Sequence, residues 1–310
     1  ILCVLMSCLL FVMAGCSGHS KNLKFGAADI GGVYYSFAST FTQLADNEID
    51  GYTFETKTTA GSVANLRLIS DGYIDLAIVQ ADLLSDAYNA TGTFADKKYQ
   101  KGYKAVASLY TECCQIVVRK DSGITGIDDL INKTVSVGAS ESGTEKNAEQ
   151  ILKMSGITDE LINKVNMDYT EAAEKLKAGE IDAFFCTAGT RTEVIGQLSK
   201  ECDICLISLD DKCIDKMLSA YSLCEKYTIP AGTYNGQDSD VTTIGVKAVL
   251  IAKQSLSDDV IKNVTKTIYE HADDFKYATS LDISFDINTA ADGVDIPFHS
   301  GAAAYYTCLL

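Results

Sequence analysis

The hydrophobic pattern of this chain alternates between short apolar runs and longer stretches with helical periodicity. Apolar runs between polar turns are typical of buried strands, and apolar residues three or four positions apart are typical of helices packed on a sheet. The pattern predicts strands at residues 23–29, 53–58, 76–79, 134–137, 163–168 and 204–209. It predicts helices at residues 37–49, 63–71, 144–154, 170–178, 192–198, 211–221 and 257–275. We therefore expect an α/β protein.

One sequence phrase occurs twice. Residues 68–78 and 176–185 both run from a helix end through a glycine, Gly72 or Gly179, to an isoleucine–aspartate pair and an apolar strand. Two similar α/β units far apart in the chain favour two related lobes over one continuous sheet. The alternative is a coincidence between two common helix–strand turns.

Two long β-rich runs, at residues 103–119 and 241–252, are predicted to cross between the lobes. This places lobe 1 at residues 21–110 plus 242–310 and lobe 2 at residues 111–241. Each lobe is expected to hold a mixed sheet with flanking helices. The crossing strands would then absorb the motion if the lobes close on a ligand.

The strongest local signal is the stretch at residues 136–152. An apolar strand runs into a turn of small residues, and Ser142 and Glu145 then have the S-x-x-E spacing of a capping box. A helix start with bare amides and hydroxyls binds anions, carboxylates included. The alternative is an ordinary strand–turn–helix with a good cap.

Further small polar turns follow the predicted strands at residues 31–36, 59–62, 80 and 187–191. Ligands of open α/β sheets bind at the carboxyl ends of strands, so we expect these turns to converge on one cleft. The glycine pair Gly31-Gly32 permits close approach of a ligand, but the third glycine of a dinucleotide fingerprint is missing and no Walker loop occurs. The cleft suits a small zwitterion or carboxylate.

Charge and histidine content remove several classes of function. Lys and Arg total 26 against 42 Asp and Glu, which gives a net charge of −16 over 310 residues. This argues against binding to nucleic acid or to an anionic membrane surface. His19, His271 and His299 stand in no nucleophile motif, and no carboxylate pair has a context for acid–base work. We predict no enzyme activity and no cofactor.

Residues 1–20 are predicted to be a lipoprotein signal peptide and tether. An apolar run ends in Ala14-Gly15-Cys16, which resembles a bacterial lipobox in which Cys16 is lipidated and becomes the mature N-terminus. The alternative is a plain signal peptide. Either way the protein is expected to work outside the cytoplasm, and the lipid would anchor it to the outer face of the membrane.

Eight cysteines follow the leader. Cys202, Cys205 and Cys213 lack a fourth ligand with finger-like spacing, so no metal site is predicted. A disulfide such as Cys202 to Cys213 is an open alternative, and the sequence does not assign the pairing.

The chain resembles the solute-binding subunit of tripartite ATP-independent periplasmic (TRAP) transporters, of the TAXI type. The residues that carry the resemblance span almost the whole mature chain in order: Gly31-Gly32-Val33-Tyr34-Tyr35, residues 59–69 (TAGSVANLRLI), residues 75–82 (DLAIVQAD), Gly138-Ala139 with Ser142-Gly143-Thr144-Glu145, Asp182-Ala183-Phe184-Phe185, residues 229–234 (IPAGTY) and His299-x-Gly301-Ala302. The resemblance implies a two-lobed periplasmic-binding-protein fold of type II-like topology that closes on its ligand. It also implies delivery of glutamate, glutamine or another small organic acid to an integral membrane TRAP permease.

By position in this family, nine residues are predicted ligand contacts: Gly32, Tyr34, Tyr35, Gln80, Ser142, Gly143, Thr144, Thr187 and Arg191. Amides and hydroxyls of 142–144 would hold a carboxylate, a tyrosine would cover its apolar part, and Gln80 and Thr187 would bind a polar group from opposite lobes. Many relatives have a proline after Ala188-Gly189, where this chain has Thr190-Arg191-Thr192. Arg191 would either pair with an acidic ligand or face solvent. An alternative function is a surface lipoprotein that binds a protein partner or acts as a sensor.

Overall fold

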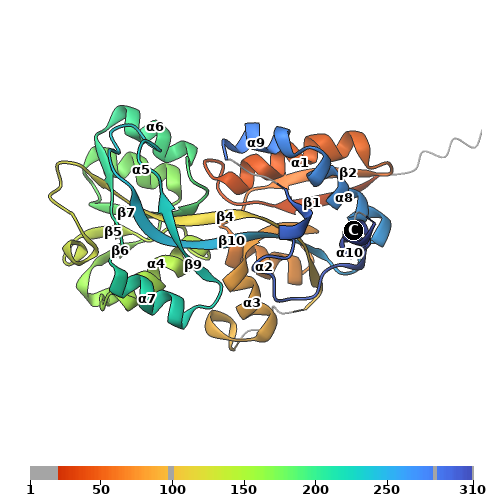
Figure 1. Cartoon of the computed structure of the whole chain (residues 1–310), viewed down its shortest axis with the longest axis horizontal. Coiled ribbons are helices and arrows are strands. Elements are labelled where there is room, and N and C mark those ends of the chain that lie inside the picture. The colour runs from red at the N-terminus through yellow and green to blue at the C-terminus, as the bar shows by residue number, and fades with distance from the viewer. Residues whose placement is uncertain (1–19, 97–100, 282–284, 309–310) are drawn as a thin grey trace, which may run out of the picture.

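The computed structural model describes residues 20–96, 101–281 and 285–308, and shows two α/β lobes joined by two long strands (Figure 1). The predicted lipidation site, Cys16, lies outside the described residues, as does nearly all of the predicted signal peptide. Helix and strand bounds are given below lobe by lobe.

Lobe 1 is built from the two ends of the chain. Its first part comprises β1 (Lys21–Gly26), α1 (Val33–Glu48), β2 (Tyr52–Lys57), α2 (Ser62–Ser70), β3 (Leu76–Gln80) and α3 (Ala81–Asn89). Its last part comprises α8 (Asp258–Glu270), α9 (Ala272–Thr279) and α10 (Ser300–Thr307). The sequence prediction of one helix over 257–275 was wrong, because the helix breaks at His271, whose backbone leaves the helical conformation.

Lobe 2 is formed by the middle of the chain. It comprises β5 (Thr134–Ser136), α4 (Gly143–Met154), β6 (Asn163–Val165), α5 (Tyr169–Ala178), β7 (Ala183–Ala188), α6 (Glu193–Glu201), β8 (Ile204–Leu206), α7 (Asp211–Ala220) and β9 (Cys224–Ile229). The pattern missed α3 and β9. In β9, buried Cys224 and Ile229 flank mostly exposed residues, so the strand carries little apolar signal.

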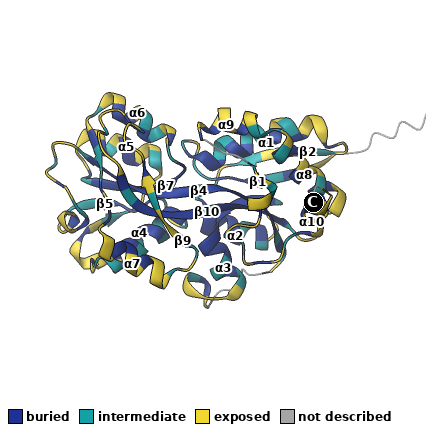
Figure 2. Ribbon diagram, viewed as in Figure 1, coloured by how far each residue is buried: buried dark blue, intermediate teal, exposed yellow. Residues whose placement is uncertain are grey.

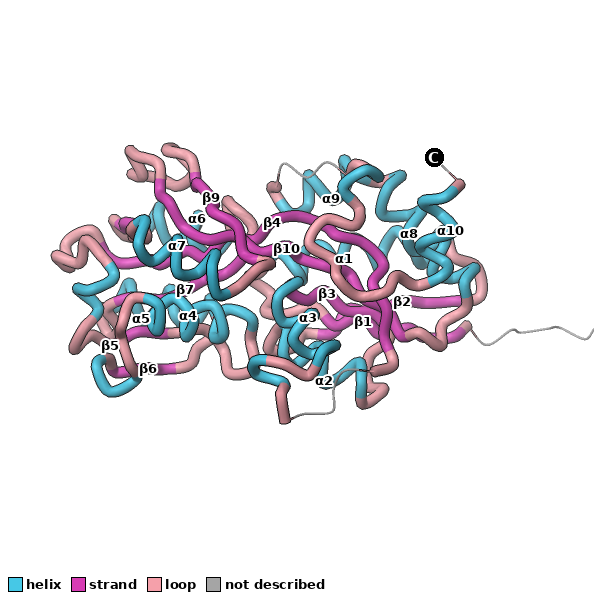
Figure 3. Tube along the Cα trace, turned by 60° about the horizontal axis from the view of Figure 1, so that its bottom comes forward, coloured by secondary structure: helices cyan, strands magenta, loops and turns pink. Residues whose placement is uncertain are grey.

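The crossing strands β4 (Tyr103–Arg119) and β10 (Val241–Lys253) pair antiparallel through the middle of the molecule (Figure 3). Within the described residues the strand order is β2-β1-β3-β10-β4-β7-β5-β6, with β8 on β4 and β9 on β10. The expectation of two lobes without a continuous sheet is corrected in this respect. Hydrogen bonding is continuous because β10 pairs with β3 of lobe 1, while β4 pairs with β7 of lobe 2.

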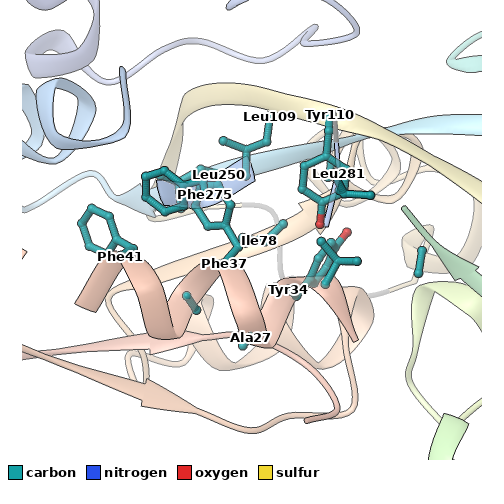
Figure 4. Close-up of a cluster of buried hydrophobic side chains, with 14 of the residues drawn as sticks. Ala27, Tyr34, Phe37, Phe41, Ile78, Leu109, Tyr110, Leu250, Phe275 and Leu281 are labelled. Atoms are coloured by element: carbon teal, nitrogen blue, oxygen red, sulfur yellow. The ribbon is translucent and has the colours of Figure 1, made fainter. Parts of the chain in front are cut away.

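The core lies on both faces of this sheet, and the crossing strands are buried along most of their length (Figure 2). One cluster packs α1, α8 and α9 of lobe 1 and α5 and α6 of lobe 2 on the same face. In it Phe37 of α1 stacks on Phe275 of α9 with ring centroids 4.3 Å apart (Figure 4). Separate clusters fill the opposite face under α2 and α3 and under α4 and α7.

A buried asparagine joins the strand ends of lobe 1. Asn65 of α2 is fully buried and donates to the backbone oxygens of Ala27 and Ile78, at 2.6 and 2.9 Å, and accepts from the Thr59 hydroxyl at 2.7 Å. Buried polar groups are stable only when they are hydrogen-bonded, and here the side chain satisfies carbonyls that follow β1 and lie in β3. It thereby fixes the loops that face lobe 2.

All eight cysteines among the described residues are free thiols, including Cys202 and Cys213. No group of three or more His, Cys, Asp and Glu within the described part of the chain is arranged to hold a metal ion. In the same residues no helix is long and apolar enough to cross a membrane.

Candidate functional site: a cavity between the lobes

A cavity of about 40 Å³ lies between the two lobes. This is room for a few water molecules, so a larger solute enters only when the lobes separate or side chains shift. Lobe 1 and the crossing strand β4 line it with Ala28, Asp29, Gly32, Val33, Tyr34, Ala60, Gly61, Ser62, Gln80 and Glu112. Lobe 2 lines it with Ala139, Ser142, Gly143, Thr144, Asp168, Tyr169, Thr187 and Ala188.

Direct contacts between the lobes surround this cavity. The backbone amide of Ala64 in α2 donates to the carbonyl oxygen of Glu141, at 3.1 Å, and the Arg67 guanidinium pairs with the Glu141 carboxylate at 2.7 Å. Asn147 of α4 lies 3.5 Å from the carboxylate of Asp82 in α3. The structure is therefore a closed form, in which the lobes meet through hydrogen bonds as well as packing.

The start of α4 forms one wall. The Ser142 hydroxyl accepts a hydrogen bond from the amide of Glu145 at 2.9 Å, as the capping prediction requires. In a full capping box the amide of Ser142 would in turn donate to the Glu145 carboxylate. Here that carboxylate accepts a hydrogen bond from the amide of Glu141 instead. With the Glu145 amide bound to the cap, the amides of Gly143 and Thr144 are the remaining donors of the first turn.

Gln80 reaches across from lobe 1 onto this helix start. A Cβ atom added to Gly143 would come within 2.3 Å of the Gln80 side-chain oxygen. Any larger residue at this position would force the Gln80 side chain to shift in the closed form. Gln80 and Gly143, both predicted ligand contacts, therefore lie against each other at the boundary of the lobes.

Thr144, Tyr169 and Thr187 form a small hydrogen-bonded ring in lobe 2. The Tyr169 hydroxyl donates to the carbonyl oxygen of Thr187 at 2.9 Å and lies 2.6 Å from the Thr144 hydroxyl. The Thr187 amide donates back to the Thr144 hydroxyl oxygen at 3.1 Å. The ring ties α4, α5 and β7 together beneath the cavity.

Glu112 of β4 is the most buried carboxyl group of the cavity, with 2% of its surface exposed. It accepts a hydrogen bond from the Tyr34 hydroxyl at 2.8 Å. Burial raises the pKa of Glu112 to about 8, against the lowering effects of hydrogen bonds from Tyr34 and Gln80. The same burial, and then the nearby Glu112 charge, raises the pKa of Tyr34 far above its ordinary value.

Two more carboxylates face each other across the lobe boundary. Burial and then the charge of Asp168 raise the pKa of Asp29, while backbone amides of both lobes oppose the rise. Asp168 also caps α5, where its side chain accepts from the Glu171 amide at 2.8 Å. Helix α5 begins at Tyr169, one residue before the predicted start at residue 170.

Seven of the nine predicted contact residues line the cavity: Gly32, Tyr34, Gln80, Ser142, Gly143, Thr144 and Thr187. Tyr35 does not, because α1 begins at Val33, four residues earlier than predicted, and turns the side chain of Tyr35 away into partial burial against the core. Arg191 lies instead in a second, wider hollow of about 330 Å³ between α1, α6 and α9. The roles of all nine residues in ligand binding stay predictions.

Sequence reasoning missed Asp29, Glu112, Asp168 and Tyr169. A signal for Glu112 was present, since it is an isolated acid within a long apolar run that was correctly predicted to be a strand. A charged residue in a buried strand needs a partner or a function. Asp168 and Tyr169 gave no comparable signal, because acids and aromatics at helix starts are common.

The family model of the NMT1-like family matches residues 25–307. The chain belongs to the NMT1-like family. The match covers both lobes and the two crossing strands, so the cavity lies wholly within the part of the chain that defines this family.

Solved structures share the fold of this NMT1-like chain at low sequence identity. A protein from Bordetella bronchiseptica RB50 matches with a TM-score of 0.56 and 17% identity, over 84% of this chain and 76% of that one. PhnD1 from Prochlorococcus marinus, in complex with methylphosphonate, matches with 0.55 and 13%, over 81% and 84%. A putative L-cystine ABC transporter protein from Listeria monocytogenes matches with 0.53 and 12%, over 84% and 94%. The predicted two-lobed periplasmic-binding-protein fold is confirmed.

Proposed function

We propose that this protein is an extracytoplasmic solute-binding protein that captures a small amino acid or organic acid by closure of its lobes. The observation that carries the proposal is the cavity itself. It is walled by both lobes, and each lobe contributes a helix start and buried polar side chains to it. Ligand sites of this kind are enclosed and carry a few well-placed polar groups.

The solved structures support the class of function. They include a complex with methylphosphonate, a putative L-cystine ABC transporter protein and the substrate-binding protein of an amino acid ABC transporter. At such low identity they share the fold with this chain, so the solute has to be inferred from its own cavity. Absence of a nucleophile or an acid–base pair in a reactive context, already inferred from the sequence, agrees with binding without turnover.

Carboxylate binding is assigned to the start of α4. The free amides of its first turn and the positive end of the helix dipole favour an anion there. Ser142 fixes the helix start by capping it, and the ring of Thr144, Tyr169 and Thr187 holds the neighbouring strand end. A bound carboxylate would add contacts between α4 and lobe 1, and this would stabilise the closed form.

Delivery to a membrane permease of the TRAP type is proposed from the family resemblance, as is a lipid anchor at Cys16. Delivery to a permease and a lipid anchor both agree with a protein that acts outside the cytoplasm. The net charge of −16 keeps a protein soluble and away from anionic lipid head groups, so that a lipid at the N-terminus would be the contact with the membrane.

A thermal-shift screen of the purified protein tests the proposed function. The panel contains the common amino acids, dicarboxylates and short organic acids, and calorimetry follows every hit. Ligand at 100 times its dissociation constant stabilises a protein by about 2.7 kcal/mol, a rise of a few degrees for a chain of this size. A rise with a member of the panel supports the function. No rise with any member, in protein shown to be folded and ligand-free, contradicts it.

A further inference from the structure

The charged groups of the cavity are all acidic. Among the described residues that line it, Asp29, Glu112 and Asp168 carry carboxyl groups, and there is no Lys, Arg or His. Arg191, the only arginine among the predicted ligand contacts, lies in the second hollow. A solute with two carboxylates would therefore place one at the start of α4 and the other against the acids of the cavity.

Hydrogen-bond acceptors in the cavity also lack donors. The side-chain oxygen of Gln80 and one carboxylate oxygen of Asp29 are buried and have no hydrogen-bond partner within the described residues. Gln80 is 2% exposed, and its side chain lies at the boundary of the lobes against Gly143. Buried acceptors without a partner are costly, so a solute that supplies N–H groups is favoured over one that supplies only oxygen acceptors.

Among the described residues, no Lys, Arg or His is paired with Glu112. The titratable groups that interact with it are Tyr34 of α1, Asp82 of α3, Tyr110 and Cys113 of β4, Tyr169 of α5 and Cys186 of β7. Each of these is neutral or negative. The two lysines of the adjacent strand β10 bond elsewhere, Lys247 to Thr111 and Lys253 to Asp75. A buried carboxylate is stable only with a paired charge or strong donors, so the ionised form of Glu112 would be stabilised by a positive charge on the solute.

We propose that the cavity selects solutes that carry an ammonium group, which donates hydrogen bonds to the Glu112 carboxylate and the side-chain oxygen of Gln80. The inference rests on the proposed solute-binding function and narrows its solute class from carboxylates in general to zwitterions. The carboxylate of the solute lies at the start of α4 and its ammonium lies toward β4. Asp29 and Asp168, in the same lining, add further negative potential to the cavity.

The competing arrangement has a protonated Glu112 that donates its hydrogen bond to a second carboxylate of the solute. The two arrangements differ in the sign of their pH dependence. An ammonium needs Glu112 ionised, so that its binding strengthens as the pH rises from 6 to 8. A dicarboxylate needs Glu112 protonated, so that its binding weakens over the same range.

The test compares pairs of solutes that differ only in the amino group. Calorimetry at pH 6 and pH 8 measures L-glutamate against glutarate, L-glutamine against glutaramate and L-alanine against propionate. For at least one pair we expect the amino form to bind about 10- to 100-fold tighter, the range for a hydrogen bond to a charged group, and to bind tighter at pH 8. A deamino form that binds equally or better, or amino-form affinity that falls toward pH 8, overturns the inference and leaves the proposed function standing. If no compound binds, the proposed function fails with it.

Variants locate the effect on Glu112. Glu112→Gln keeps the shape of the side chain and removes its charge, and we expect it to lose the preference for the amino form while binding of the deamino form changes by less than about threefold. Glu160→Gln, on the exposed surface of lobe 2, is the matched control and keeps the preference. If Glu112→Gln prefers the amino form of the solute as strongly as the original protein does, the assignment of the ammonium to Glu112 is overturned. If Glu112→Gln does not fold, the solute pairs and their pH dependence in the original protein decide.

Discussion

At the scale of single residues, the cavity is lined by buried polar side chains whose charges and hydrogen-bonding groups are incompletely paired in the ligand-free protein. Glu112 is buried beside tyrosines and another acid, and Gln80 keeps an oxygen without a partner. Binding sites are where proteins commonly tolerate such strain, because the ligand supplies the missing interactions. The cost should appear in the stability of the ligand-free protein.

The raised pKa of Glu112 predicts a dependence of stability on pH. Its pKa is about 8 in the folded protein against an ordinary value of 4.5. Its stabilising contribution is therefore complete below pH 4.5 and is lost as the pH rises to about 8, by up to about 1.4 kcal/mol for each pH unit. Glu112→Gln should be more stable than the original protein at pH 8, and this advantage should shrink toward pH 5.

Urea unfolding of both proteins between pH 5 and 8.5, without ligand, measures the effect. His271, whose pKa Asp274 and Glu48 raise, is present in both proteins and cancels in the difference. Asp82, whose pKa burial raises to about 6, interacts with Glu112, so its titration contributes to the difference at the acidic end of the range. A difference in the free energy of unfolding that stays constant with pH would show that Glu112 is not the titrating group.

At the scale of elements, the site is an arrangement of helix starts around two crossing strands. Helices α1, α2 and α4 each present their first turn to the cavity, and β4 carries Glu112 where its partners change from lobe 1 to lobe 2. Close contact of α4 with lobe 1 depends on Gly143. Gly61, before α2, has a φ of +123°, which residues with a side chain rarely adopt, and a Cβ added there would lie in ordinary van der Waals contact with Ser142.

Replacement of Gly143 by alanine should separate closure from folding. Alanine is favoured over glycine inside a helix by up to about 1 kcal/mol, so the ligand-free protein should unfold at the same or a higher temperature. The added Cβ displaces Gln80 from its place in the closed form, and we expect solute affinity to fall by about tenfold or more.

Gly196→Ala is the matched control, since Gly196 lies inside α6 and an added Cβ would meet nothing within 4 Å. It should keep full affinity. Thermal unfolding and calorimetry on the two variants check the prediction, and unchanged affinity in Gly143→Ala would mean that the Gln80 contact is not needed for binding.

At the scale of the whole molecule, the structure holds the two lobes in contact. The two lobes meet through the Arg67–Glu141 ion pair, the Ala64–Glu141 backbone bond and the contact between Asp82 and Asn147. The strands β4 and β10 show register shifts beside Ala248 and Leu250, where their regular pairing is interrupted. Such interruptions are natural places for a change of strand curvature when the lobes separate.

The ion pair between the lobes should favour the closed form modestly. Arg67 and Glu141 are about one-third and two-fifths exposed at their side chains, and pairs of this kind contribute up to about 1 kcal/mol. Glu141→Gln should therefore weaken solute binding by up to about fivefold, with less effect at high salt. Glu180→Gln, which removes a pair with Lys175 inside lobe 2, should leave binding unchanged.

Small-angle scattering gives the matching structural readout. The ligand-free protein should be more extended than the closed form, and saturating solute should compact it. Glu141→Gln should need a higher solute concentration for the same compaction. Scattering profiles that are identical with and without bound solute would contradict closure as the mode of capture.

The sequence by itself determined the α/β class, the two crossing strands and the turns that gather at the site, because hydrophobic periodicity and caps are local properties of the chain. Ser142 could be predicted as a cap for this reason. Only the tertiary structure decided that β4 and β10 join the lobes into one hydrogen-bonded sheet, that α1 begins early enough to turn Tyr35 away, and that Arg191 lies outside the cavity. It also brought Asp29, Glu112 and Asp168, which are distant in the chain, to the lining of one cavity. Glu112 is buried there, Asp29 is half-buried and Asp168 is exposed, and this burial depends on residues that meet only when the lobes are folded and in contact.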